Sequence, residues 1–316
     1  MMENIVEIKE LTKKFPSGKL AVDNLSLKVK KGDILGFLGP NGAGKSTTIN
    51  MMMDLMNKTS GTITLFGESA THKSNEVRSK IGMVPQEIAI YEDLTAIENV
   101  NFFGGLYGLR GKKLKTASLQ ALRFVALEKN AKEKAGNFSG GMKRRLNIAC
   151  AIVHEPQLIV MDEPTVGIDP QSRNFILGII EALNKRGTTI IYSTHYMEEV
   201  ERISNKIAVI DHGKMIAYGS ENELISLVTD TQKFNIEIAY PERINVKRIQ
   251  VISGVQSVEI KEQVLQVVAD SEKNPLDDIL KVLVDEKAAI KMVTQDKLNL
   301  ENVFLMLTGR KLRDSK

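Results

Sequence analysis

Residues 39–46 have the spacing of a loop that holds the phosphates of a nucleoside triphosphate. Their sequence, Gly-Pro-Asn-Gly-Ala-Gly-Lys-Ser, matches the pattern G-x-x-x-x-G-K-[ST] at every specified position. Glycine lets the backbone pass close to phosphate oxygens with its N–H groups turned inward, and lysine is long enough to reach the outer phosphates. The pattern therefore predicts that the protein binds ATP or GTP. The residues expected to bind it here are Gly39, Pro40, Asn41, Gly42, Ala43, Gly44, Lys45, Ser46 and Thr47.

The segments on either side of this loop fit the same interpretation. Residues 34–38 are a short apolar run, typical of a buried parallel strand, and residues 46–56 have the pattern of a helix. The N-terminus of such a helix would face the phosphates, and the Ser46 hydroxyl could bind Mg²⁺. A glycine-rich surface turn, the alternative interpretation, does not require these flanking elements.

Two carboxylates follow a second apolar run, residues 158–161. Asp162 and Glu163 stand where a buried strand ends, which is the edge from which open α/β sheets bind their ligands. Asp162 is expected to join the Mg²⁺ shell, and Glu163 to polarise the water that attacks the γ-phosphate. An Asp-Glu pair after a strand is common and often structural, but its combination with a phosphate loop favours catalysis.

The composition bounds the rest of the chain. Its 316 residues are enough for two domains, and 42% apolar with 26% charged residues is typical of a soluble globular protein. No stretch approaches the roughly 20 apolar residues of a membrane span, and residues 1–10 lack the core of a secretory signal, so a cytoplasmic protein is expected. The net charge of +4 is small and dispersed, so no nucleic-acid partner is expected. The single cysteine, Cys150, excludes an internal disulfide and is interpreted as a small core residue.

Periodicity predicts an α/β fold for the first part of the chain. Residues before 31 alternate between apolar and polar, as two antiparallel strands joined near residues 16–18 would. Short apolar runs separated by helical stretches then predict a parallel sheet, interrupted by an all-helical segment from about Leu94 to Leu127. The runs are residues 34–38, 81–84, 158–161, 189–192 and 207–210.

The pattern restarts after a helix predicted at residues 220–229. Strands are expected at residues 234–240, 256–261, 264–269 and 288–294, and helices at residues 275–286 and 300–312. We therefore predict a first domain over residues 1–230, with a helical subdomain at about 87–155. A small α+β accessory domain, resembling a ferredoxin-like layer, is predicted over residues 231–316.

Residues 138–142, Phe-Ser-Gly-Gly-Met, resemble the signature sequence of ATP-binding cassette (ABC) ATPases, commonly written L-S-G-G-Q. Ser139 offers a hydroxyl, and Gly140 and Gly141 offer backbone N–H groups, at the start of a helix, which together can bind an anion. The chain departs from the common form at Phe138 and Met142. Met142 followed by Lys-Arg-Arg-Leu is similar to the signature of exporter-type cassettes.

The resemblance extends over residues 4–229 and implies roles for three more side chains. Phe15 would stack on adenine, Gln86 would link the nucleotide to a membrane partner, and His195 would lie near the γ-phosphate. Taken singly, such residues are more often structural. Residues 167–170 are similar to the family's D-loop, with isoleucine where leucine is usual. The resemblance thus implies catalytic roles for Lys45, Gln86, Glu163 and His195, nucleotide contacts from Ser139, Gly140 and Gly141, and Mg²⁺ ligands in Ser46, Gln86 and Asp162.

Two further segments resemble cassettes that serve separate export permeases, including drug and bacteriocin self-resistance systems. These are residues 91–109 and residues 300–309, although the first could be ordinary core and the second an ordinary amphipathic helix. The resemblance implies a motor that hydrolyses ATP with Mg²⁺ at the cytoplasmic face of the cell membrane. Its partners would be a polytopic permease and a second cassette placed head to tail, either another copy of the chain or a paired different cassette, because the signature helix faces away from its own ATP in this family. The exported substrate could be a drug, an antimicrobial peptide, a lipid or an ion.

Other functions remain open at this point. An importer ATPase is the nearest alternative, although the tail alternates strands and helices where sugar-uptake motors have a β-rich tail. Ribosome-associated cassette proteins normally carry two cassettes in one chain, and this chain has one. Chromosome-maintenance ATPases need a long coiled coil between the phosphate loop and the signature, and residues 46–139 lack sustained heptads.

Overall fold

The computed structural model of the chain describes residues 3–72, 74–227, 231–270, 273–296 and 300–308. They form two compact units, one up to Glu221 and one from Asn222 onward. The predicted domain boundary at residue 230 lies outside the described residues, so it stays a prediction.

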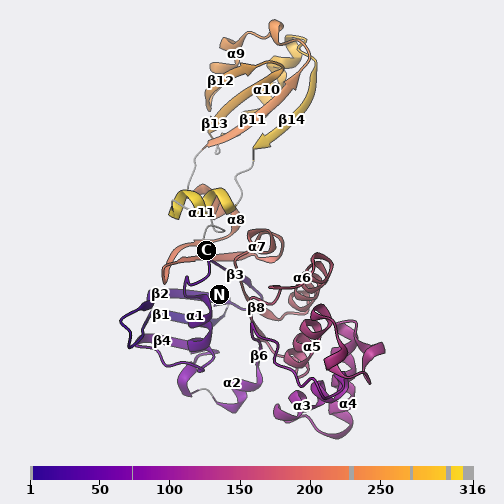
Figure 1. Cartoon of the computed structure of the whole chain (residues 1–316). Coiled ribbons are helices and arrows are strands. Elements are labelled where there is room, and N and C mark those ends of the chain that lie inside the picture. Colours follow the sequence, from indigo (N-terminus) through magenta and orange to yellow (C-terminus); the bar gives the residue numbers. More distant parts are fainter. Residues whose placement is uncertain (1–2, 73, 228–230, 271–272, 297–299, 309–316) are drawn as a thin grey trace. The chain divides into compact units, whose positions relative to one another are not determined.

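A six-stranded sheet forms the centre of the first unit, in the order β10-β9-β3-β8-β7-β6 (Figure 1). Every pair of neighbours is parallel except β10 and β9. The apolar runs form these strands because they are buried on both faces, as parallel strands covered by helices must be. The predicted α/β class is confirmed, and β10 is the one strand of this sheet that was not predicted. The strands are β3 (Ile34–Leu38), β6 (Ile81–Val84), β7 (Leu158–Asp162), β8 (Thr189–Thr194), β9 (Lys206–Asp211) and β10 (Lys214–Gly219).

An antiparallel sheet in the order β2-β1-β4-β5 belongs to the same unit. The predicted strand pair is present as β1 (Asn4–Lys14) and β2 (Leu20–Lys30), joined by a turn at residues 15–19. Alternating residues of both strands are buried, which explains the period of two in the sequence. Strands β4 (Ser60–Leu65) and β5 (Glu68–Ser69) complete this sheet and were not predicted.

Three helices make up the helical subdomain, α3 (Ala96–Leu106), α4 (Gly111–Phe124) and α5 (Gly140–Ile152), and they lie together in Figure 1. Their apolar sides join one buried cluster with β7 and with α6 (Pro170–Lys185). Cys150 is part of that cluster, and burial raises the pKa of its thiol, so the predicted core role is confirmed. The remaining helices of the unit are α1 (Lys45–Met52), α2 (Asn75–Ser79), α7 (Met197–Ile203) and the short 3₁₀ turns η1 (Ala70–His72), η2 (Glu128–Asn130) and η3 (Ala135–Asn137).

Helix α1 ends four residues earlier than predicted. Asp54 adopts a left-handed conformation with φ 65°. The Leu55 N–H then donates to the carbonyl of Asn50, and the Asp54 N–H donates to that of Met51. This pair of hydrogen bonds is a helix-ending motif that usually has glycine at the left-handed position. The apolar residues after Met52 therefore lie in a turn and not in the helix.

A stacked ring pair ties the helical subdomain to the sheet. The rings of Tyr107, just after α3, and His154, just after α5, lie parallel with their centres 3.5 Å apart. The His154 Nε2 lies 3.1 Å from the Ile81 carbonyl oxygen of β6, and the Tyr107 hydroxyl donates to the same oxygen at 3.3 Å. Burial lowers the pKa of His154 to about 4, so its ring is neutral at pH 7.

The second unit contains an antiparallel sheet in the order β12-β13-β11-β14. Its elements follow in the sequence β-α-β-β-α-β, and this sequence and strand order are those of the predicted ferredoxin-like layer. Buried residues of β11 and β13 pack with α9 and α10 in a separate apolar core. The elements are α8 (Glu221–Ser226), β11 (Thr231–Ile238), η4 (Pro241–Arg243), α9 (Val246–Gln250), β12 (Val255–Lys261), β13 (Val264–Asp270), α10 (Leu276–Asp285), β14 (Ile290–Asp296) and α11 (Leu300–Thr308). Residues 309–312, predicted to continue the last helix, lie outside the described residues.

Candidate functional site

The predicted phosphate loop connects β3 to α1. At Gly44, just before the helix, φ is 106°, and a Cβ atom there would lie 2.5 Å from the carbonyl oxygen of Ala21. Only glycine satisfies both conditions. The turn between β9 and β10 braces the loop, because the Gly213 N–H donates to the Ala43 carbonyl at 2.9 Å. The Gly213 carbonyl in turn accepts from the Asp23 N–H of β2 at 2.9 Å.

The Lys45 side chain lies folded along this loop. Its ammonium donates to the carbonyls of Gly39 at 2.7 Å and Pro40 at 3.1 Å. It also forms an ion pair with Glu163 at 3.0 Å, in which both side chains are at least 94% buried. Lys45 and Glu163, chosen from segments 118 residues apart, are therefore in direct contact.

One serine of β8 holds the Asp162 carboxylate and the backbone of Glu163 at the end of β7. The Ser193 hydroxyl donates to the Asp162 carboxylate at 2.5 Å. The Glu163 N–H donates to the hydroxyl and the carbonyl of Ser193, at 3.0 and 3.1 Å. Glu163 has a φ of 45°, a conformation that is costly for a residue with a side chain and is found at functional sites. Ser193 was not predicted, although it stands two residues before His195.

His195 lies on the other side of Glu163, with its Nδ1 3.4 Å from the carboxylate. The segment that carries it is fixed by Glu199 of α7, whose side chain is 2% exposed. One carboxylate oxygen of Glu199 accepts hydrogen bonds from three hydroxyls, those of Thr165 at 3.0 Å, Tyr192 at 2.7 Å and Thr194 at 2.8 Å. Burial, and next the charge of Glu199, raise the pKa of Tyr192. This network was missed because its members are scattered along 35 residues of sequence.

A cavity lies beside the phosphate loop and brings several predicted residues together. Phe15, Lys45, Gln86 and Glu163 all line it, as do loop residues. Lys19 also lines it and was not predicted. The other residues of its lining are Ala21, Asn41, Gly42, Gly44, Ser46 and Thr47. An aromatic ring, a buried lysine and loop N–H groups on one cavity fit a nucleoside triphosphate. Hydroxyl, amide and carboxylate oxygens from Ser46, Gln86 and Asp162 are the hard donors that Mg²⁺ prefers.

The signature residues are at the start of α5 and are not part of this cavity's lining. Ser139 is the N-cap of the helix, and its hydroxyl accepts from the Met142 N–H at 3.3 Å. Gly141 faces α6, and a Cβ atom there would collide with the Ser172 hydroxyl. Asp169, in the predicted D-loop, caps α6 by accepting from the Ser172 N–H at 2.9 Å, and this bond lowers its pKa. The N-terminal ends of α5 and α6 therefore pack closely within one chain.

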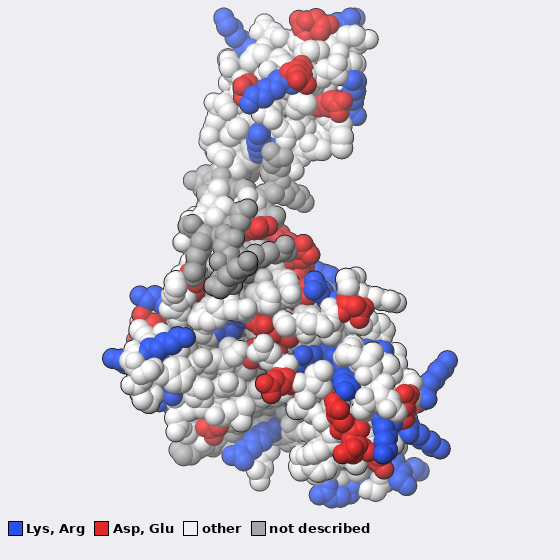
Figure 2. Space-filling model, viewed as in Figure 1, with Lys and Arg blue, Asp and Glu red and all other residues white. Residues whose placement is uncertain are grey.

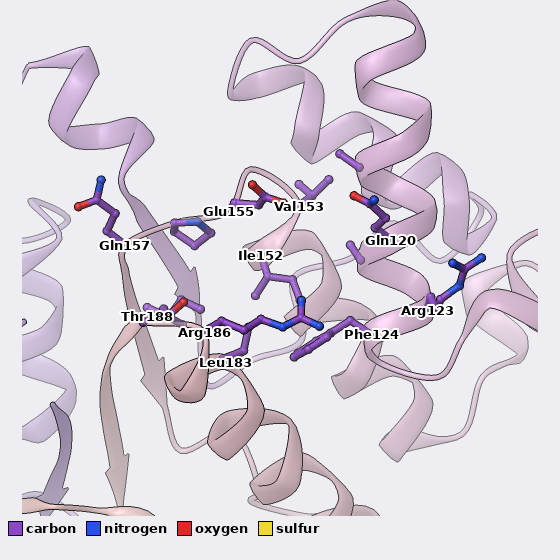
Figure 3. Close-up of a pocket in the computed structure, with 15 residues that line it drawn as sticks. Gln120, Arg123, Phe124, Ile152, Val153, Glu155, Gln157, Leu183, Arg186 and Thr188 are labelled. Carbon is purple, nitrogen blue, oxygen red and sulfur yellow. The ribbon is translucent and has the colours of Figure 1, made fainter. Parts of the chain in front are cut away.

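A larger cavity, of about 590 Å³, lies where β7 and β8 begin, at the opposite ends of the strands from Asp162 and Thr194 (Figure 3). Its lining includes Arg186, whose guanidinium lies 4.3 Å from the ring centre of Phe124. It contains none of the predicted site residues. In the view of Figure 2, acidic and basic side chains are interspersed, with no broad surface of one sign.

No helix in the described residues is long and apolar enough to cross a membrane. Among the same residues, no three His, Cys, Asp or Glu side chains gather as a metal-binding cluster.

Comparisons with known proteins agree with this site. Residues 22–166 match the family model described as ABC transporter. The chain is 42% identical to the linearmycin resistance ATP-binding protein LnrL of Bacillus subtilis (strain 168), over 96% of this chain and 99% of that protein. It is 38% identical to the Nod factor export ATP-binding protein I of Rhizobium sp. (strain N33), over 95% of this chain and 96% of that protein.

Solved structures of ATP-binding cassettes superpose on most of the chain. One is cbiO1 from Clostridium perfringens, part of the ABC transporter complex cbiONQ, with a TM-score of 0.64 and 26% identity over 72% of this chain and 94% of that one. Another is a dimeric post-hydrolysis state of the cassette MJ0796 bound to ADP and Pi, with a TM-score of 0.62 and 28% identity over 68% of this chain and 98% of that one. The chain belongs to the ABC transporter family and is an ATP-hydrolysing subunit of that family.

Proposed function

We propose that the chain is the motor subunit of an exporter, which couples ATP binding and hydrolysis to movement of a separate permease. The observation that carries the proposal is the contact of Lys45 with Glu163, and of Glu163 with His195, beside a cavity that Phe15 and Gln86 also line. Relatives named for export and for resistance match nearly the whole chain, which favours export over the alternatives of an importer or a non-transport ATPase. A drug, an antimicrobial peptide, a lipid or an ion fits as substrate, since the permease would select it.

In this proposal the loop and Lys45 hold the phosphates, and Phe15 stacks on the adenine. Glu163 polarises the attacking water, and His195 lies near the γ-phosphate and stabilises its charge. The Lys45 ammonium is an electrostatic stabiliser for the charge that develops on the transferred phosphoryl group. The strained backbone of Glu163, fixed by Ser193, keeps its carboxylate at the cavity.

Mg²⁺ would be held by Ser46, Asp162 and Gln86, and it would neutralise phosphate charge during hydrolysis. Because Mg²⁺ keeps water and phosphate ligands, three protein oxygens are a sufficient set. Asp162 is already oriented by its bond from Ser193.

The signature residues Ser139, Gly140 and Gly141 would complete the site of a second copy of the chain in a head-to-tail homodimer. The solved dimer of a similar cassette supports this arrangement, as does the separation of Ser139 from the lining of its own chain's cavity. One chain carries both half-sites, so a homodimer would hold two complete sites.

The permease would bind near the segment that contains Gln86, and the motor would then lie at the cytoplasmic face of the membrane. A groove is lined by Met53, Arg78, Met83, Leu106 and Tyr107 among others, and Met83 stands three residues before Gln86 in the sequence. Leu106 is 68% exposed, and Tyr91 and Phe102, nearby in sequence, are 49% and 43% exposed. Exposed apolar side chains beside a groove are typical of a protein interface.

Assembly gives the sharpest test of this proposal. In the Glu163→Gln variant, which should retain ATP, gel filtration is expected to show an ATP-dependent dimer, and an added Ser139→Arg should abolish it. The matched control is Thr116→Arg, at an exposed position of α4 away from the signature, tested for folding by circular dichroism. A chain that remains monomeric with ATP, both alone and in vesicles that contain its permease, would contradict the homodimer.

A further inference from the structure

The run Lys143-Arg144-Arg145, directly after the signature, attaches α5 to two other segments of the first unit. Lys143 pairs with Glu92 at 2.6 Å. Arg144 donates to the carbonyls of Pro85 at 2.9 Å and Gln86 at 2.7 Å. Arg145 donates instead to the carbonyl of Val125, after α4, at 3.2 Å. Two of the three side chains therefore hold one segment, residues 85–92, which we name the Gln86 loop.

Arg144 makes the strongest of these attachments between α5 and the Gln86 loop. Its side chain is 4% exposed, and burial lowers the pKa of its guanidinium. No carboxylate lies within ion-pair distance of it among the described residues, so the two backbone carbonyls are its electrostatic partners. A buried cation that loses its partners is costly, so the loop cannot leave Arg144 without leaving this charge unsolvated.

The other end of the Gln86 loop is fixed to the segment before the signature. The Glu92 carbonyl accepts from the Gly136 N–H at 2.9 Å. The Lys143–Glu92 ion pair adds little, because the Glu92 side chain is 62% exposed and surface pairs contribute little stability. The loop is thus attached at both ends to the residues that flank Ser139.

We propose that Arg144 is a positioning residue that makes the Gln86 loop and the signature helix move as one body. The inference rests on the proposed function, in which Gln86 contacts the nucleotide's metal and Ser139 contacts the nucleotide of the second copy. Through Arg144, movement of Gln86 toward one nucleotide would carry Ser139 toward the other. A permease that moves the Gln86 loop would act on both sites by the same route.

A double-mutant cycle tests this coupling, with steady-state ATP hydrolysis by the full chain as the readout. The variants are Gln86→Ala, Arg144→Gln and both together. Because the guanidinium bonds the backbone of residue 86, Gln86→Ala keeps these bonds and removes only the side chain that they position. Arg145→Gln, alone and with Gln86→Ala, is the matched control, since Arg145 does not hold the loop.

We expect Arg144→Gln to lower kcat by about tenfold, the effect of one charge-assisted hydrogen bond, with little change in ATP affinity. In the Gln86→Ala background the same change should have little further effect, whereas Arg145→Gln should act additively with Gln86→Ala. If Arg144→Gln unfolds the chain, Arg144→Lys keeps the charge, loses the two-pronged geometry and should give the same non-additivity.

Additive effects of Arg144 and Gln86 in folded variants would overturn the coupling and leave the proposed function intact. A Gln86→Ala chain with unchanged hydrolysis would overturn both the coupling and the assigned role of Gln86. Loss of ATP-dependent dimerisation in Glu163→Gln, seen separately by gel filtration, would count against the proposed function itself.

Discussion

Replacing Glu163 by glutamine should separate nucleotide binding from hydrolysis and should strengthen binding. Glu163 is expected to polarise the attacking water, so its loss should lower kcat by about 10²–10⁴-fold. The same carboxylate holds the Lys45 ammonium at 3.0 Å, in a pair at least 94% buried. ATP phosphates compete with this carboxylate for the lysine, so the neutral amide should release Lys45 to the nucleotide.

The size of the affinity gain follows from the geometry. At 3.0 Å and an effective dielectric constant of about 20, the direct attraction of the pair is about 5.5 kcal/mol. Desolvation of the two buried charges offsets most of this attraction. A net of about 1–2 kcal/mol would tighten ATP binding by about 5- to 30-fold in the variant.

Isothermal titration calorimetry with Mg²⁺ and ATP, and phosphate release, measure the two effects on the same protein. Lys45→Ala is the reference variant and should abolish nucleotide binding. Equal losses of ATP affinity in the Lys45→Ala and Glu163→Gln variants would refute the assignment of Glu163 as the base. Unchanged ATP affinity in the Glu163→Gln variant would refute only the proposed competition between Glu163 and ATP for Lys45, and not the role of Glu163 as the base.

Three further predictions concern stability, positioning and the second unit. The pKa of His154 is lowered from 6.5 to about 4, so the unfolded chain binds the proton more tightly. The free energy of unfolding is therefore highest above pH 6.5 and falls as the pH is lowered toward 4. Between pH 7 and pH 5 this loss of stability is about 1–2 kcal/mol. Urea unfolding at both pH values should show that loss in the parent and not in His154→Gln. Glu199→Gln keeps one acceptor for the hydroxyls but removes the charge opposite Arg173, so we expect a lower melting temperature and about tenfold lower kcat at similar ATP affinity. An unchanged kcat in the folded variant would show that Glu199 does not position His195. A chain ending at Asp230, if circular dichroism shows it folded, should bind ATP as the full chain does while the concentration dependence of its ATPase rate shifts; an unchanged dependence would show that residues 231–316 do not tune dimer opening.

Much of the fold could be predicted because its strands carry strong, local patterns. The bounds of β3 and β6 agree with the apolar runs, since such runs are stable only when both faces are buried. The early end of α1 could not be predicted, because the signal was Asp54 in place of the usual glycine. Strand β4 pairs with β1, and β10 pairs with β9. Both sequences mix apolar residues with polar residues and glycine, so they do not distinguish these strands from loops.

The candidate site was predictable where a motif carries the chemistry and was missed where packing does. Lys45 and Glu163 were chosen from their motifs, and the structure places them in contact. Ser193 and Glu199 act on neighbouring segments through hydrogen bonds that no local spacing reveals. Arg144 was seen only as part of a subfamily pattern, because its partners are backbone carbonyls almost 60 residues earlier, which leave no trace in side-chain types.

The brace between the phosphate loop and the β9–β10 turn has a consequence for the order of folding. The bond from Gly213 to Ala43 joins residues 170 positions apart, and Gly213 also accepts from Asp23. Contacts of such long range form late, because the chain between them must be ordered first. As the ribosome releases the chain from its N-terminus, the motif at residues 39–46 would emerge early and yet remain unbraced. A nascent chain would then gain its full affinity for ATP only once residue 213 is available, so nucleotide binding would report completion of the whole first unit.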